Sequence, residues 1–297
     1  MSILAIEWRV NMQIGFIGAG NMAQAIIKGL INKKVVESDD IIVNDTQIDI
    51  LSDVKTTYEV NVTIQKKEVL RFSDVIILAV KPNNIEEVIE DIKQDMKLFN
   101  SSTIFISIAA GVSLETLEKY FSNDNNSNGF GYVESLEDDF QLKIVRAMPN
   151  MPAAVGEGMT GITSNKNVKF SDIDQILKIF GAIGKVELVE EKMMDAVVAL
   201  SGSSPAYMYL ILDAMATAAE KAGMKKSMAL KFAAQAMIGS GKVILDKKED
   251  PQELIKKVCS PGGTTIEAMD VLEKNNVKDI FIDAMDACME KSKSLMR

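Results

Sequence analysis

A glycine-rich turn near the start of the chain is the first candidate binding element in the sequence. A β-branched run, Gln13–Ile17, leads into the turn Gly18–Ala23 (Gly-Ala-Gly-Asn-Met-Ala), and an apolar helical stretch, Ala25–Leu30, follows. Glycine permits the tight turn, and unpaired backbone N–H groups at a helix N-terminus attract the diphosphate of a dinucleotide. A simple glycine-rich turn would look the same, but the strand before it and the helix after it favour dinucleotide binding. The candidate binding residues are Gly18, Gly20, Asn21 and Met22.

Two further strand ends supply candidates for the same site. Carboxyl ends of parallel strands line the ligand crevice of an open α/β sheet, so the turns after the second strand and after the run Val75–Val80 are expected to border the cofactor. Asp45 could accept hydrogen bonds from the ribose hydroxyls of NAD or cap the next helix, and both interpretations stay open. In the other turn we assign the function to the backbone and not to the ammonium of Lys81. The candidates are Asn44, Asp45, Ala79, Val80, Lys81 and Pro82.

A second unusual cluster lies in the last quarter of the chain. Ser260 is followed by Pro-Gly-Gly and then by Thr264 and Thr265. Thr264 and Glu267 have the spacing of a capping box, which predicts that a helix begins there. The loop before it would leave backbone N–H donors at the helix mouth, where a carboxylate binds well. An ordinary capped helix has the same spacing, and spacing alone favours that interpretation.

The elements that must position these residues differ between the two halves of the chain. In the first half, short apolar runs alternate with helix-like segments, and several runs are apolar throughout. That pattern is typical of parallel strands covered on both faces, so we expect an α/β fold with a doubly wound sheet. After Lys185–Val189, Ala, Met and Leu recur at helical spacing, which predicts an all-α C-terminal domain. The expected strands of the first half are Gln13–Ile17, Ile41–Val43, Val75–Val80, Thr103–Ile108, Lys143–Met148 and Met159–Thr163.

These patterns define the expected domains. We place a dinucleotide-binding domain at residues 1–190 and an all-helical domain at residues 191–297. A polar segment without periodicity, residues 122–139, interrupts the first domain. A segment this polar can bury too little apolar surface to offset the entropy lost on ordering it, so we expect a disordered surface insertion there.

Composition narrows the chemistry further. The 297 residues include no histidine, which excludes a Ser-His-Asp triad, a histidine zinc ligand and a histidine general acid. Cys259 and Cys288 are too few for a four-thiolate zinc site or a disulfide framework, so we expect no metal and reduced thiols. There are 33 basic and 42 acidic residues, a net charge of −9, without the basic patch that nucleic-acid binding needs.

The sequence also gives no sign of export or membrane insertion. Glu7 and Arg9 interrupt the apolar start, so a signal peptide is not expected. The longest charge-free run, Ala196–Leu212, contains glycine and proline and is shorter than the roughly 20 residues of a membrane-spanning helix. We therefore expect a cytoplasmic protein with no membrane partner.

Five separated segments together resemble one enzyme family, the pyrroline-5-carboxylate reductases. The resemblance spans residues 12–297 and implies an N-terminal Rossmann domain that binds NAD(P)H and a C-terminal helical domain that forms an intertwined homodimer. In that family the partner subunit helps to complete each active site, and larger assemblies of dimers occur. The implied reaction is the last step of proline synthesis, hydride transfer to the C=N carbon of 1-pyrroline-5-carboxylate. The segments are GFIGAGNMAQAI (15–26), LAVKP (78–82), RAMPNMP (146–152), ALSGSSPAYMY (199–209) and SPGGTTIEAM (260–269).

The resemblance also implies residue roles in the substrate site. Thr265 corresponds to the hydroxyl near the substrate nitrogen, and Ser260 holds the substrate carboxylate together with the backbone of Gly262, Gly263 and Thr264. A cyclic imine can be activated by one hydroxyl or by water, so the absence of histidine is compatible with this chemistry.

The chain departs from the family pattern at several positions. Ser204 stands where the family usually has glycine, and the polar insertion replaces a short link. Lys66 stands where the family often has asparagine, and Thr46-Gln47 where it often has arginine, so Lys66 is the candidate partner of a cofactor phosphate. The resemblance favours NADPH, with NADH as the alternative.

Two other functions fit parts of the sequence. A 3-hydroxyacid or imine dehydrogenase of the same architecture would share the cofactor turn, but such enzymes generally rely on a lysine in the helical domain. A non-catalytic NAD(P)-sensing protein would keep the fold without turnover. Loss of Thr265 or of the Gly-Gly pair would have favoured the sensor, and the chain has both.

Overall fold

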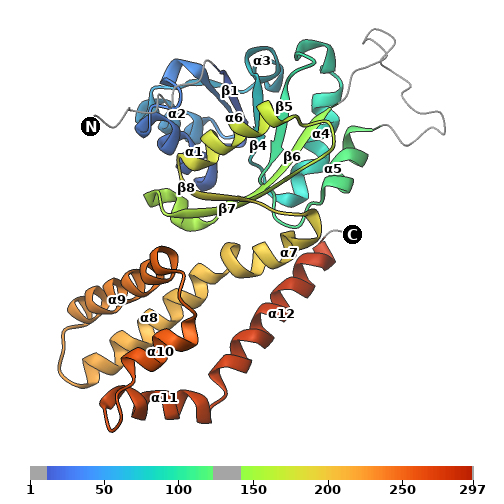
Figure 1. The fold of residues 1–297 in the computed structure, drawn as a ribbon. Coiled ribbons are helices and arrows are strands. Elements are labelled where there is room, and N and C mark those ends of the chain that lie inside the picture. The colour runs from blue at the N-terminus through green and yellow to red at the C-terminus, as the bar shows by residue number, and fades with distance from the viewer. Residues whose placement is uncertain (1–11, 123–141, 296–297) are drawn as a thin grey trace, which may run out of the picture. The chain divides into compact units, whose positions relative to one another are not determined.

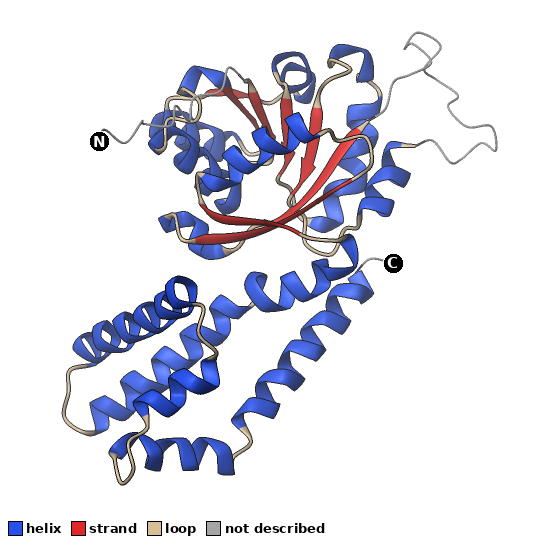
Figure 2. Cartoon of the chain, viewed as in Figure 1, coloured by secondary structure: helices blue, strands red, loops and turns tan. Residues whose placement is uncertain are grey.

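The computed structural model describes residues 12–122 and 142–295 (Figures 1 and 2). Almost all of the expected insertion at 122–139 and the start of the chain lie outside the described residues. The chain divides into two compact units, residues 1–202 with 289–297 (unit 1) and residues 203–288 (unit 2). We describe each unit by itself.

Unit 1 is built on one eight-stranded sheet in the order β3-β2-β1-β4-β5-β6-β7-β8. All neighbouring strands are parallel except β6 and β7, which pair antiparallel. The strands are β1 (Ile14–Ile17), β2 (Ile41–Asn44), β3 (Asn61–Thr63), β4 (Val75–Leu78), β5 (Ile104–Ser107), β6 (Lys143–Met148), β7 (Gly158–Ser164) and β8 (Gly184–Leu188).

Helices cover both faces of this sheet, as the apolar runs predicted. Side chains of β1 alternate between two separate clusters, with Ile14 and Phe16 in one and Ile17 in the other. The first cluster includes residues of α1 (Asn21–Asn32), α2 (Ile48–Tyr58) and α6 (Phe170–Gly181). The second includes residues of α3 (Lys66–Phe72), α4 (Ile85–Lys93) and α5 (Leu114–Phe121). The doubly wound α/β fold is therefore confirmed.

The strand order reverses at β1 and β4, and in open α/β sheets the ligand crevice lies at the carboxyl ends of the strands at such a point. From β1 the chain runs outward to β2 and β3 and then returns to β4 on the other side of β1. Ile17 pairs with Asn44 on one side and with Leu78 on the other, so the three strands end at the same level. Ligands of open α/β sheets bind at such a reversal of strand order.

Unit 2 is entirely helical over its described residues. Its helices are α8 (Ser204–Lys221), α9 (Lys226–Lys247), α10 (Pro251–Val258), α11 (Thr264–Lys274) and most of α12 (Val277–Leu295), and α8 packs along α9. Few of their side chains are buried, whereas many large apolar ones are exposed, among them Leu210, Phe232 and Leu245. Unit 2 thus lacks a core of its own comparable to that of unit 1.

Short helical segments complete unit 1. Before unit 2 begins, the chain forms η5 (Glu191–Met193), α7 (Met194–Val197) and a π-helical turn, η6 (Val198–Gly202). Four 3₁₀ turns lie earlier: η1 (Ser38–Asp40), η2 (Pro82–Asn84), η3 (Met96–Leu98) and η4 (Met151–Val155).

The expected strands are confirmed within two residues at each end, and Lys143–Met148 is exact. Two strands were not among the expected ones: β3, which has three residues and one buried side chain, and β8, which lies at the end of the first half of the chain. The boundary between the compact units falls after Gly202, whereas the sequence placed a domain boundary after residue 190. The last turns of α12 belong to unit 1.

One helix within the described ranges, α9, is long and apolar enough to cross a membrane by length and composition alone. Only 11% of its apolar window is buried within the chain. Its exposed apolar surface requires an explanation, which we give below.

Candidate active site

The glycine-rich turn touches the end of β4 so closely that a side chain does not fit. Gly18 has φ +101°, and a Cβ atom there would lie 2.6 Å from the carbonyl oxygen of Ala79. The backbone N–H of Gly18 donates to the carbonyl of Asn44, and that of Ala79 donates to Ile17, both at 2.8 Å. The turn is therefore fixed against two neighbouring strands, and this position requires glycine.

The next glycine leaves open space at the start of α1. Gly20 is the N-cap of α1 and is exposed, and a Cβ atom there would meet no described atom within 4 Å beyond its neighbours along the chain. None of the described side chains caps this helix. The N-terminal N–H groups, including those of Asn21 and Met22, are therefore presented to the crevice, where a diphosphate can accept from them.

Asp45 links the end of β2 to the glycine turn. Its Oδ2 accepts the backbone N–H of Ala19 at 2.8 Å, and its Oδ1 accepts that of Gln47 at 2.9 Å. The expectation that Asp45 caps the next helix is wrong, because Gln47 is the N-cap of α2. A carboxylate has about four acceptor sites, so these two bonds leave capacity for a ribose hydroxyl.

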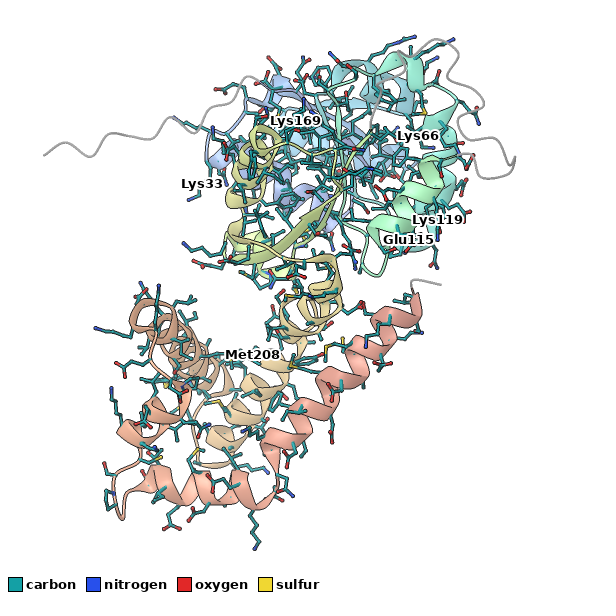
Figure 3. All side chains as sticks on the ribbon, turned by 45° about the vertical axis from the view of Figure 1, so that its right-hand side comes forward. Lys33, Lys66, Glu115, Lys119, Lys169 and Met208 are labelled. Atoms are coloured by element: carbon teal, nitrogen blue, oxygen red, sulfur yellow. The ribbon has the colours of Figure 1, made fainter. Side chains whose placement is uncertain are left out.

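Asn44 and Lys66 are engaged within the protein. Asn44 is buried and donates through its amide to the carbonyl of Thr63 at 3.0 Å, which joins β2 to β3. Lys66 is the first residue of α3 (Figure 3). Its ammonium donates to Asp91 of α4 at 2.6 Å. No motif indicated Asp91, because the pair joins residues 25 positions apart. A phosphate at Lys66 would compete with this carboxylate.

The residues of the turn after β4 differ in their exposure. Ala79 and Val80 are half-buried, and Lys81 and Pro82 are exposed. Lys81 precedes the 3₁₀ turn η2, and its carbonyl accepts from Asn84 at 2.9 Å. The close contact of Ala79 with Gly18 brings this turn to the glycine-rich loop.

In unit 2, the Ser-Pro-Gly-Gly loop leads into α11. Gly262 has φ +70°, and the N–H of Gly263 donates to the carbonyl of Ser260 at 2.9 Å. The loop is therefore a tight turn that glycine makes feasible, and Ser260 and Gly262 are exposed on it.

The helix begins at Thr264 as expected, but the capping box is wrong. The N-cap of α11 is Gly263, which has no side chain, so Thr264 is the first helical residue and Thr265 the second. None of the described side chains caps α11. The first N–H groups of the helix are thus open, which favours carboxylate binding over the ordinary capped helix.

The segment from Leu200 to Tyr207 crosses from the π-helical turn into α8. Cys288 donates through its thiol to Ser203 at 3.3 Å, and both cysteines are free thiols. Burial raises the pKa of Tyr207, and its hydrogen bond to Cys288 raises that pKa further. Tyr207 is therefore a neutral hydrogen-bonding group at physiological pH.

Two family models match the chain. Residues 191–295 match the model described as pyrroline-5-carboxylate reductase dimerisation, and residues 13–111 match NADP oxidoreductase coenzyme F420-dependent. The second match contains the glycine turn, Asp45 and the turn after β4. The first contains the loop and helix start at 260–265.

Curated relatives cover nearly the whole chain. Pyrroline-5-carboxylate reductase of Escherichia coli is 40% identical over 97% of this chain and 100% of its own length. This chain belongs to the pyrroline-5-carboxylate reductase family. The family reductase of Methanosarcina acetivorans is 36% identical over 96% of this chain and 98% of its own.

Solved structures agree with this membership of the reductase family. A pyrroline-5-carboxylate reductase from Coxiella burnetii has a TM-score of 0.83 at 33% identity, covering 97% of this chain and 100% of its own. The Plasmodium falciparum pyrroline carboxylate reductase, solved with NADP bound, has a TM-score of 0.81 at 30% identity, with the same coverage.

The two glycines of the cofactor turn form a matched pair for mutation. Gly18→Ala should lower the free energy of unfolding by about 1–3 kcal/mol, because its φ is positive and its Cβ would overlap Ala79. Gly20→Ala should fold normally, but its methyl group would occupy the space assigned to the diphosphate. Its affinity for reduced dinucleotide should fall at least about tenfold, which corresponds to loss of one or two hydrogen bonds. Thermal melting and fluorescence titration of the same preparations measure both effects. Wild-type affinity in Gly20→Ala would remove the turn from the cofactor site.

Proposed function

We propose that the protein is an NAD(P)H-dependent reductase that converts 1-pyrroline-5-carboxylate to proline, the last step of proline biosynthesis. The observation that carries the proposal is the uncapped start of α11 behind the Pro-Gly-Gly turn, where backbone donors and the hydroxyl of Thr265 occur together. Membership of the reductase family supports it over the whole chain. The cofactor turn in the same chain supplies the redox partner.

The cofactor fits the crevice of unit 1. Backbone N–H groups after Gly20 would hold the diphosphate, and the turn from Ala79 to Pro82 would border the nicotinamide side of the crevice. Asp45 would accept from the adenosine ribose while keeping the turn in place. When bound, the reduced nicotinamide supplies the hydride.

The substrate fits the loop of unit 2. Ser260 and the backbone of Gly262, Gly263 and Thr264 would hold the ring carboxylate at the positive end of α11. The hydroxyl of Thr265 would donate to the ring nitrogen as that atom gains electron density and a proton. One neutral donor suffices for an imine, so the chain needs no histidine.

We propose that unit 2 forms the homodimer. Exposed apolar side chains along α8 and α9 give it more apolar surface than an isolated soluble domain tolerates, and residues 191–295 match the family's dimerisation domain. A second copy of the chain would bury this surface. Burial in the dimer would also explain why α9 is apolar although we propose a cytoplasmic protein without a membrane partner. Assembly of dimers into larger complexes is a further part of this proposal.

A direct assay tests the function. Purified protein should oxidise NADPH, and more weakly NADH, only when 1-pyrroline-5-carboxylate is present, and proline should accumulate in equal amount. The measurement is the absorbance of the reduced cofactor, with proline quantified by mass spectrometry. Folded protein that binds cofactor and turns over neither one would contradict the reductase assignment.

Thr265 is the residue assigned to the imine nitrogen. Thr265→Val preserves the side-chain shape and removes the hydroxyl, so kcat should fall up to about a hundredfold, the lower range for a general acid. Thr265→Ser should retain more activity because it keeps the donor. Melting temperatures of both should match the wild type, because Thr265 does not cap α11. An unchanged kcat in Thr265→Val would remove this residue from the mechanism.

Cofactor preference depends on the pair formed by Lys66 and Asp91. Both side chains are partly exposed, and such a pair contributes about 0.2–1 kcal/mol. Asp91→Asn should therefore lower KM for NADPH up to about fivefold without changing KM for NADH, if Lys66 binds the 2′-phosphate. Glu90→Gln is the matched control, since Glu90 pairs with Lys93 on the same helix. Equal changes for both cofactors would exclude Lys66 as the phosphate partner.

The dimer surface is tested by one charge placed on α9. Phe232 is 67% exposed within the chain, and Phe232→Glu should convert the dimer to monomer in sedimentation. Burying a phenylalanine side chain in the dimer interface stabilises the dimer by about 1.5–3 kcal/mol, and the carboxylate variant would lose this contribution. Phe170→Glu, on a phenylalanine of unit 1 that is even more exposed, should leave the dimer intact. A Phe232→Glu dimer, or wild-type protein that sediments only with lipid, would contradict the proposal.

A further inference from the structure

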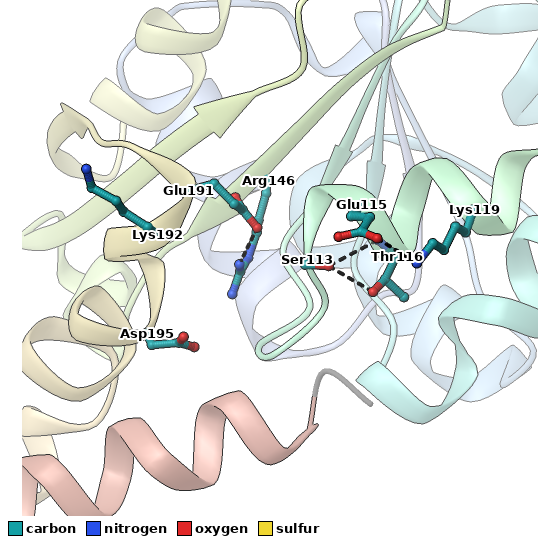
Figure 4. Close-up of a pocket in the computed structure, with 8 residues that line it drawn as sticks. All are labelled: Ser113, Glu115, Thr116, Lys119, Arg146, Glu191, Lys192 and Asp195. Carbon is teal, nitrogen blue, oxygen red and sulfur yellow. Dashed lines mark hydrogen bonds and ion pairs between the residues drawn. The ribbon is translucent and has the colours of Figure 1, made fainter.

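Unit 1 contains a polar hollow that the reductase mechanism does not use. Its volume is about 430 Å³, and it lies among the start of α5, β6 and the η5–α7 segment (Figure 4). All of its lining residues belong to unit 1, whereas the proposed substrate loop belongs to unit 2. The lining residues are Ser113, Glu115, Thr116, Lys119, Arg146, Glu191, Lys192 and Asp195.

Two buried polar atoms in this lining have no hydrogen-bond partner among the described residues. Arg146 is 2% exposed, and its Nη1 donates to Oε1 of Glu191 at 2.8 Å, while its Nη2 has no partner. Glu191 accepts a second bond from the N–H of Leu114 on Oε1, while its Oε2 has no partner. Figure 4 shows the guanidinium of Arg146 pointing into the space between Ser113 and Asp195. Unpaired buried donors and acceptors are rare and costly. The ion pair of Arg146 and Glu191 therefore keeps one guanidinium nitrogen and one carboxylate oxygen available for a further hydrogen bond.

Neighbouring side chains add one donor and one acceptor. The hydroxyls of Ser113 and Thr116 share a single hydrogen bond at 2.8 Å, so one hydroxyl hydrogen is left for another acceptor. Ser113 and Glu191 already occupy N–H groups of α5, so the helix start itself is not the anion site. Asp195 accepts from Ser292 through Oδ1 at 2.6 Å, and a carboxylate has further accepting capacity.

The formal charges of the lining balance. Lys119, Arg146 and Lys192 oppose Glu115, Glu191 and Asp195. The hydrogen bond from Lys119 holds the pKa of Glu115 below its usual range, so Glu115 stays a carboxylate at neutral pH. A simple anion or a simple cation gains no net attraction from such a lining. A small molecule that carries both charges interacts favourably with both sets.

We propose that this hollow binds the zwitterion of a free amino acid. Its carboxylate accepts from Nη2 of Arg146 and from the spare hydroxyl of the Ser113–Thr116 pair. Its ammonium donates to Asp195 and to Oε2 of Glu191. The proposal does not rest on the reductase activity, because none of the lining residues is assigned to the cofactor or to the substrate.

Calorimetric titration of the full chain tests this site. Glycine and L-serine should bind saturably in the millimolar range, whereas acetate and methylamine, which carry one charge each, should bind far more weakly. Asp195→Asn should weaken glycine binding about tenfold or more, because hydrogen bonds to a charged group are roughly twice as strong as neutral ones. The amide oxygen can still accept from Ser292, so the fold should be kept.

Two further variants keep the test decisive. Asp195→Ala removes the carboxylate altogether and should also weaken glycine binding if Asp195→Asn does not fold, and a folded Asp195→Ala that binds glycine like wild type would contradict the proposal. Ser260→Ala, in the substrate loop, should leave glycine binding unchanged. The proposal fails if neither amino acid binds, if acetate binds as tightly as glycine, if a folded Asp195→Asn binds like wild type, or if Ser260→Ala abolishes binding.

Discussion

The carbonyl of Ala79 approaches Gly18 so closely that β1 and β4 can end side by side only with glycine at that position. This contact fixes the turn between β1 and α1, and with it the direction in which α1 begins. Asp45 holds the same turn from the other side by accepting the N–H of Ala19. Between these two constraints, Gly20 leaves the helix start open to the crevice. The proposed cofactor site is thus an uncapped helix end held in place by its neighbours, and such an end favours a bound anion.

The substrate site that we propose in unit 2 uses the same arrangement, an uncapped helix start, for a smaller anion. Gly263 is the N-cap of α11 and has no side chain, so the first turn of that helix also presents free backbone donors. The sequence predicted a capping box at this helix start, whereas the structure has a glycine N-cap. The backbone N–H groups of the loop at 260–265 are therefore more available to a carboxylate than the sequence indicated. In both units, glycine at the N-cap keeps the binding groups on the backbone, where a side chain would otherwise occupy them. Charged side chains are correspondingly absent from the residues assigned to the substrate.

The fold was largely predictable because its strands are local and strongly apolar, as in β4 and β5, which are buried at every position. The strand β3 was missed because three residues with one buried side chain carry no periodic signal. The glycine turn was predictable from spacing, but the bond from Ala19 to Asp45 was not, because it joins residues 26 positions apart. The pairs Lys66–Asp91 and Arg146–Glu191 are likewise products of tertiary structure. The unit boundary after Gly202 has the same origin, since Glu191 anchors the η5–α7 segment to β6 and α5.

The central claim is that a nucleotide held at the Gly20 turn reduces the imine carbon of a substrate activated by a hydroxyl of the helical unit. Isotope transfer tests it most directly. With cofactor deuterated at the transferable position of nicotinamide C4, the proline formed in ordinary water should carry one deuterium, on the ring carbon that was double-bonded to nitrogen. Tandem mass spectrometry locates that deuterium. Proline without deuterium, or with deuterium on the carbon that bears the carboxylate, would contradict direct hydride transfer to the imine and with it the account given for this site.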